Sequence, residues 1–210
     1  MSNPNYCVIT VANCDPKFMN KALDLTEGFK KEIELKANPI SIRYGVMSTG
    51  QYAGAIAFFQ NYASLADFEK SFGVYQAAND YQALFNSGNA SVIMRNIAKY
   101  LDIPFEQKAS AKAKYLVLTR VSGQGSMENE ITNLAPVFAN GGALTYRLAN
   151  VITGSNVGNQ LLGVTYSSMA DIEKVYDNLA ANEAYSGLLG RVDVNMRNIC
   201  LLYTSDAADE

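Results

Sequence analysis

The stretch from Arg43 to Lys70 reads RYGVMSTGQYAGAIAFFQNYASLADFEK, and its pattern occurs a second time in the chain. The second copy, from Arg147 to Lys174, reads RLANVITGSNVGNQLLGVTYSSMADIEK and lies at a constant offset of 104 residues. The residue types that recur at this offset are those of Arg43, Thr49, Gly50, Gly54, Tyr62, Ser64, Ala66, Asp67, Glu69 and Lys70. Such a repeat favours two copies of one small fold.

The repeat continues on both sides when small changes of length are allowed. Tyr6, Val8 and Thr10 recur as Tyr115, Val117 and Thr119, and the run Met-Arg-Asn-Ile at 94–97 recurs at 196–199. A period of about 100 residues exceeds the roughly 20 to 50 residues of solenoid repeats and is close to the size of a small domain. We therefore predict a first unit at 5–101, a linker at 102–113, a second unit at 114–203 and a non-native tail at 204–210.

Composition indicates a globular protein, since 49% of the 210 residues are hydrophobic and 18% are charged. We predict a cytoplasmic location, because the first residues lack the basic start and apolar centre of a signal peptide. No apolar run reaches the roughly 20 residues that span a bilayer. No cluster of Lys and Arg with interleaved aromatic residues occurs, so we expect neither nucleic acid nor a membrane as a partner.

The last eleven residues, CLLYTSDAADE at 200–210, resemble one reading frame of a sequencing-library adapter of the kind that ends truncated environmental genes. The alternative is a native acidic tail. If the resemblance holds, the natural sequence is readable only to Ile199. We expect Cys200 to Tyr203 to continue the last strand because they are apolar, and Thr204 to Glu210 to make almost no tertiary contacts.

Apolar periodicity predicts the same order of elements in both copies. In the first copy we expect strands at 6–12, 40–48, 55–60 and 91–99, with helices at 15–36 and from Ser64 onward. Asp15 and Pro16 would start the first of these helices as N-cap and first helical residue. In the second copy we expect strands from Tyr115, Ala143, Gly158 and Arg191, with helices at about 126–139 and from Ser168. Ser64 with Asp67, and Ser168 with Asp171, resemble capping boxes.

The order β-α-β-β-α-β predicts an α+β fold of two ferredoxin-like units, each a four-stranded antiparallel sheet with its helices on one face. The bare face of each sheet needs a cover, and the other copy is the simplest one. Tyr6 to Ile199 thus resembles the dimeric α/β-barrel superfamily, in which two such units join sheet to sheet. The resemblance rests on element order and repetition. Its members include cofactor-free monooxygenases, haem-degrading and haem-using enzymes, isomerases, and units without known activity.

The inventory of side chains excludes several chemistries, because the chain contains no His and no Trp. Haem-using members of the superfamily generally bind iron through His, and no position here carries that ligand over. The cysteines and carboxylates have no zinc spacing, and no Ser-His or Cys-His pair is available for nucleophilic catalysis. We expect no cofactor and no metal.

The remaining candidates are arginines on strands. If the more apolar side of each early strand faces the helices, then Arg43, Arg147, Tyr6, Tyr115, Thr10 and Thr119 point into the barrel and form a ligand-binding set. The same rule places Cys7, Ile9, Val11, Ile42, Tyr44, Leu116, Leu118, Tyr146 and Leu148 outside it, and leaves the direction of Arg95 and Arg197 open. A desolvated arginine without a carboxylate partner would be satisfied by an anionic ligand. The alternative is that these arginines pair with water, loop carbonyls or helix acids.

Two functions remain open. The first is a small-molecule-binding protein, such as a cofactor-independent monooxygenase or isomerase acting on an apolar or carboxylated compound. The second is a non-catalytic pair of domains that binds another protein or forms a homo-oligomer. A connected interior cavity of about 300 Å³ or more favours the first, and a packed interior favours the second.

Overall fold

The computed structural model describes residues 3–123 and 125–203 of the chain. The first half contains β1 (Tyr6–Cys14), α1 (Met19–Lys36), β2 (Ser41–Met47), β3 (Ile56–Tyr62), α2 (Leu65–Ala77), α3 (Asn79–Asn86) and β4 (Ala90–Tyr100). The second half contains β5 (Tyr115–Gly123), α4 (Glu128–Asn140), β6 (Thr145–Thr153), β7 (Gln160–Tyr166), α5 (Met169–Ala180), α6 (Glu183–Leu189) and β8 (Val192–Tyr203).

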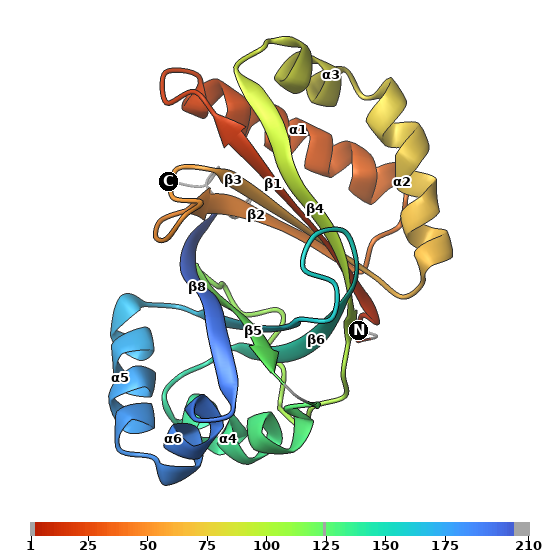
Figure 1. Ribbon diagram of the computed structural model, residues 1–210. Coiled ribbons are helices and arrows are strands. Elements are labelled where there is room, and N and C mark those ends of the chain that lie inside the picture. The colour runs from red at the N-terminus through yellow and green to blue at the C-terminus, as the bar shows by residue number, and fades with distance from the viewer. Residues whose placement is uncertain (1–2, 124, 204–210) are drawn as a thin grey trace.

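The strands close into one barrel in the order β1-β3-β2-β8-β5-β7-β6-β4. Each half contributes four antiparallel strands, and the halves meet at two equivalent seams, β2 with β8 and β4 with β6. The helices of the first half and those of the second lie on opposite outer sides of the strands (Figure 1). The predicted α+β fold of two ferredoxin-like units packed sheet to sheet is therefore confirmed.

Two helix predictions were wrong in detail. The first helix begins at Met19 instead of at Pro16, because Asp15 Oδ1 accepts a hydrogen bond from the amide of Lys17 and closes a turn before the helix. The second helix of each half is divided into two. In the first half Ala78 separates α2 from α3 with an extended ψ of 118°, and in the second half α6 starts anew from Asn182.

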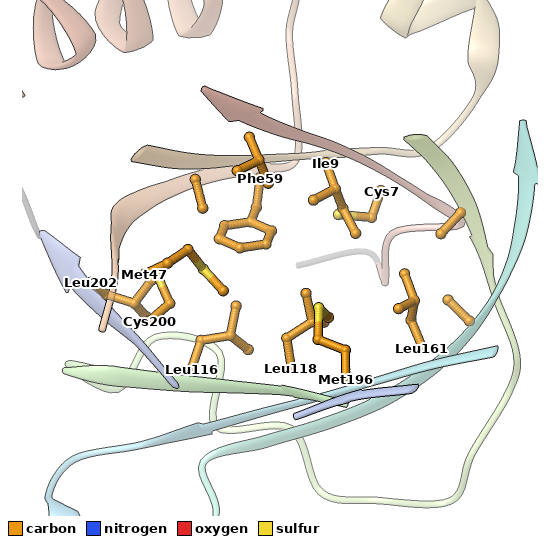
Figure 2. Close-up of a cluster of buried hydrophobic side chains, with 14 of the residues drawn as sticks. Cys7, Ile9, Met47, Phe59, Leu116, Leu118, Leu161, Met196, Cys200 and Leu202 are labelled. Carbon is orange, nitrogen blue, oxygen red and sulfur yellow. The ribbon is translucent and has the colours of Figure 1, made fainter. Parts of the chain in front are cut away.

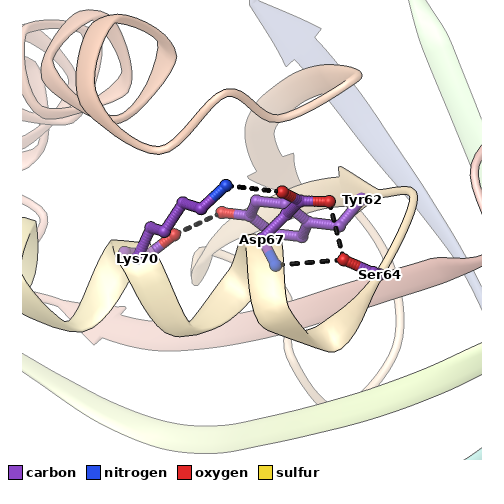
Figure 3. A network of polar contacts seen from close by, with 5 residues as sticks. Tyr62, Ser64, Asp67 and Lys70 are labelled. Carbon is purple, nitrogen blue, oxygen red and sulfur yellow. Dashed lines mark hydrogen bonds and ion pairs between the residues drawn. The ribbon is translucent and has the colours of Figure 1, made fainter.

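The predicted caps at Ser64 and Ser168 are present. Ser64 accepts a hydrogen bond from the amide of Asp67, and the Asp67 carboxylate also pairs with Lys70 at 2.8 Å (Figure 3). Ser168 caps α5 in the same way, and there the capping box is complete because Asp171 accepts a bond from the Ser168 amide. Both helices thus start where the repeated sequence predicts.

The hairpin loops at Thr49-Gly50 and Thr153-Gly154 each pack against the opposite half of the molecule. Gly50 and Gly154 have φ of 77° and 93°, as a glycine turn requires. In addition, a Cβ at Gly50 would lie 1.9 Å from Asn198 Oδ1, and one at Gly154 would lie 2.3 Å from Asn96 Oδ1. Each glycine therefore serves a turn and also packs against β8 or β4 of the other half.

Much of the barrel interior is apolar. Side chains from both sheets point toward one another between them, among them Cys7, Ile9, Phe59, Leu116, Leu118 and Leu161 (Figure 2). Separate apolar layers lie between each sheet and its own helices. Each sheet is consequently covered by apolar residues on both faces.

The end of the described chain takes part in the barrel. Cys200 to Tyr203 continue β8 as expected and pair with Met47 to Tyr44 of β2. The expectation for Thr204 to Glu210 lies outside the described residues. Among the helices of residues 3–123 and 125–203, none is long and apolar enough to cross a membrane.

Candidate ligand-binding site

A chamber of about 560 Å³ lies inside the barrel and reaches its surface beside the linker between the halves. Its apolar wall comes from both sheets and includes Ile9, Phe59, Leu116, Leu118 and Leu161. Its polar groups come from strand ends and the linker and include Ser41, Asn61, Tyr100, Gln107, Thr145 and Thr165. Arg43 and Arg147 are the charged residues among its described lining.

Arg43 enters the chamber from β2, because it shares the inward face of that strand with Gly45 and Met47 and lies opposite Phe59 of β3. It is half-buried, and its Nη2 donates a hydrogen bond of 3.2 Å to the carbonyl oxygen of Ala109 in the linker. Burial lowers the pKa of the Arg43 guanidinium, and the positive charge of Arg147 lowers it further. An arginine nevertheless stays protonated in a protein.

Arg147 enters from β6, at the position equivalent to Arg43. Its strand neighbour on β7 is Gly163, where Arg43 has Phe59 as its neighbour on β3. The guanidinium carbon of Arg147 lies 5.5 Å from the centre of the Tyr100 ring, within the range of a cation–π contact. The orientation predicted for both arginines is therefore the one found.

Tyr100 and Cys7 also line the chamber, and both are neutral at ordinary pH. Burial raises the pKa of the Tyr100 hydroxyl well above its usual value. Burial likewise raises the pKa of the Cys7 thiol to about 12, although the neighbouring Tyr100 hydroxyl and the positive charge of Arg147 oppose this shift. The Tyr100 hydroxyl donates a hydrogen bond of 2.9 Å to Asn61 Oδ1.

The chamber therefore carries an uncompensated positive charge. Its described lining contains no Asp or Glu. None of the ion pairs formed by the described residues involves Arg43 or Arg147. Charges removed from water without a partner are costly, so two arginines facing one apolar chamber favour an anion as occupant.

The other four predicted site residues do not face the chamber. Tyr6 lies opposite Tyr62, which belongs to the apolar layer under the helices, and Tyr115 packs in the corresponding layer of the second half. Thr10 and Thr119 lie on the same outer face. The prediction failed because Cys7, Ile9, Val11, Leu116 and Leu118 line the barrel, whose interior is as apolar as the layer under the helices.

The arginines whose direction the sequence left open also face the helices. Arg95 Nε donates to Thr10 Oγ1 at 3.0 Å, and its guanidinium lies 4.8 Å from the Tyr75 ring centre. Arg197 Nε donates to Thr119 Oγ1 at 3.4 Å, and its guanidinium lies 5.0 Å from the ring centre of Tyr176. These two arginines therefore connect sheets to helices and have no part in the chamber.

Several polar residues of the barrel interior were not identified from the sequence. Tyr100 and Asn61 lie at strand ends in runs of mixed polarity, where alternation gives no clear direction. Gln107 belongs to the linker, and its side-chain amide bonds both the carbonyl and the amide of Tyr146, which fixes the linker against β6. Arg120 shares the inward face of β5 with Leu118 but lies outside the chamber lining, and its buried Nε has no hydrogen-bond partner.

The side chains of the chamber do not suit a haem. Some members of the superfamily that the sequence resembles use this group. The chain has no His. The described residues contain no group of three His, Cys, Asp or Glu that could hold a metal ion. Cys7 has the thiol among the chamber residues named, and burial raises its pKa, which opposes the thiolate form that binds metals.

By its fold the protein is a dimeric α/β barrel contained in one chain. The chain belongs to the family described as Domain of unknown function (DUF6854), whose model matches residues 4–100 and 113–201. A search of curated proteins found no match.

Three of the similar solved structures have the same fold at low sequence identity. A candidate chlorite dismutase has a TM-score of 0.67 and 10% identity, with 97% of this chain and 96% of that chain covered. A candidate monooxygenase from Fusobacterium nucleatum has a TM-score of 0.62 and 11% identity, with coverage of 97% and 94%. An anthrone oxidase-like protein has a TM-score of 0.60 and 13% identity, with coverage of 97% and 93%.

Proposed function

We propose that the protein binds a small, largely apolar compound with an anionic group inside its barrel. The observation that supports this most directly is the chamber of about 560 Å³, which lies within the range of about 300 to 1,000 Å³ of small-molecule sites. A non-catalytic pair of domains would need no such space in its centre.

The anionic group would lie between Arg43 and Arg147. Arg43 uses one donor on the linker carbonyl of Ala109, and a guanidinium has five N–H donors, so most remain for a ligand. Carboxylates match this planar fork in a bidentate manner. The apolar part of the compound would lie against Phe59, Leu118 and Leu161.

A cofactor-independent monooxygenase or isomerase is the enzymatic form of this proposal. In such a reaction the two arginines would stabilise negative charge that develops on a substrate oxygen, as fixed donors in a water-poor site do. Tyr100 would remain a neutral phenol beside the substrate, because its raised pKa opposes ionisation. The names of the similar structures, which include monooxygenases and an anthrone oxidase-like protein, agree with an oxidation of this kind.

The test is a titration of aromatic and aliphatic carboxylates against the wild-type protein and its Arg43→Gln and Arg147→Gln variants. Binding heat and melting temperature are followed together. Hydrogen bonds to charged groups contribute about 1.5 to 3 kcal/mol, so each substitution is expected to weaken binding by at least about tenfold. Fold stability is expected to change little, because neither arginine pairs with a described carboxylate.

Arg191→Gln is the matched control, because Arg191 lies on the surface and pairs with Glu130 far from the chamber. It removes one arginine and is expected to leave binding unchanged. The proposal is wrong if no carboxylate binds the wild type while Arg43→Gln and Arg147→Gln both lower its melting temperature. If carboxylates do bind, an assay for turnover of quinols or aromatic acids under air distinguishes an enzyme from a binding protein.

A further inference from the structure

The two sides of the chamber carry different polar groups, although its two halves are built from equivalent strands. Tyr100 on β4 has Leu202 as its equivalent on β8, and Asn61 on β3 has Thr165 on β7. The two arginines, in contrast, occur in both halves. A ligand in this chamber therefore meets positive charge from both sheets but a phenol from one alone.

The phenol of Tyr100 is held in a fixed position. Its hydroxyl donates to Asn61 Oδ1 at 2.9 Å, and Asn61 Nδ2 donates to Ser41 Oγ at 3.0 Å. The ring contacts the guanidinium of Arg147. Because the Tyr100 proton is directed to Asn61, the phenol oxygen keeps acceptor capacity for a donor on a ligand.

We propose that Tyr100 selects ligands that carry a hydroxyl group in addition to the carboxylate, and that the compound class of this chamber is the apolar hydroxy carboxylates. The carboxylate binds Arg43 and Arg147, and the ligand hydroxyl donates to the Tyr100 oxygen. This inference rests on the proposed function of the same chamber. It adds a specificity-determining residue and narrows the ligand class.

The probes are 2-naphthoate and its 1-, 3- and 6-hydroxy derivatives, with the methoxy analogue of whichever derivative binds best. At least one hydroxylated isomer is expected to bind the wild type about three- to tenfold more tightly than 2-naphthoate, as one neutral hydrogen bond allows. The methoxy analogue lacks the donor and is expected to lose this gain. In Tyr100→Phe the gain is expected to disappear, while the affinity for 2-naphthoate itself stays the same.

Tyr115→Phe is the control, since Tyr115 packs under the helices of the second half, outside the chamber. It is expected to preserve the gain. The inference is overturned if naphthoates bind through the arginines but hydroxylation brings no gain, or if the gain survives in Tyr100→Phe or in the methoxy analogue. If no naphthoate binds the wild type, the proposed function fails for aromatic carboxylates and this inference fails with it.

Discussion

Gly154 and Gly158 lie in the same hairpin loop and have nearly the same positive φ, 93° and 88°. They differ in their surroundings. A Cβ at Gly154 would meet Asn96 Oδ1 at 2.3 Å and the carbonyl oxygen of Arg95 at 2.5 Å, whereas a Cβ at Gly158 would meet nothing within 4 Å. The pair therefore separates backbone strain from contact between the halves.

Gly158→Ala is expected to lower the free energy of unfolding by about 1 to 2 kcal/mol, the cost of a left-handed L-residue. Gly154→Ala is expected to cost clearly more, because the added methyl also pushes β4 away from the loop. Urea melts of both variants measure the difference, and Gly50→Ala with Gly54→Ala repeats the comparison at the other seam. Equal losses within each pair would show that the loops do not hold the halves together.

The buried thiols predict how stability depends on alkaline pH. Burial raises the pKa of Cys7 and of Cys200 to about 12 each. Since the unfolded chain loses these protons near pH 9, the stabilisation is complete below that pH and is lost as pH rises toward 12. The free energy of unfolding is expected to fall by about 1.4 kcal/mol per pH unit for each thiol.

Urea melts under reducing conditions between pH 8 and 9.5 measure this fall at pH values below the pKa of about 10 of an ordinary tyrosine. The Cys7→Ala, Cys200→Ala double variant is expected to flatten it. An unchanged slope in the double variant would assign the alkaline sensitivity to other groups.

The sequence predicted correctly for some side chains, and wrongly for others, whether they point into the barrel or toward the helices, and one physical reason explains both outcomes. On β2 and β6 an arginine alternates with a tyrosine or leucine, and this contrast identifies the inward face. On β1 and β5 both faces are apolar, because a closed barrel covers the inner face with the opposite sheet. Choosing the more apolar face as the outer one therefore misplaced Tyr6, Thr10, Tyr115 and Thr119.

At the scale of elements, the serine caps give the clearest prediction. Ser64→Ala and Ser168→Ala each remove an acceptor from the amide at the third helical position. Each is expected to lower the free energy of unfolding by about 1 kcal/mol. Ser91→Ala, at an exposed position of β4, is the control and is expected to stay within about 0.5 kcal/mol of the wild type. Thermal or urea melts measure all three, and a loss at Ser91 equal to those at the caps would contradict the assignment.

The strands and helix caps could be predicted because alternation and capping residues are local signals. The division of the second helix in each half could not. The chain leaves the helical conformation at Ala78, a fully buried alanine with no glycine or proline beside it. Packing against the sheet determines that break, and packing is not visible in a local pattern.

For the whole molecule, repetition in the sequence predicted that one sheet would cover the other. It could not predict the size of the space between them. The volume of that space depends on which positions of its lining carry small residues, such as Ala98, Ala149 and Gly163. It also depends on the linker, which the Gln107 bonds fix beside the opening. Both are products of tertiary packing.

The two seams have a consequence for assembly. Each joins a strand of one half to a strand of the other through four residue pairs. The same pairings can form between two chains, so refolding at high protein concentration is expected to give some domain-swapped dimers. In a dimer of one Arg43→Gln chain and one Arg147→Gln chain, one barrel would lack both arginines and the other would regain both. To test this, the two weakly binding variants are refolded together and carboxylate binding is measured in the dimer fraction. Recovered binding would reveal the complementation. If binding does not return, the halves of one chain close only on each other.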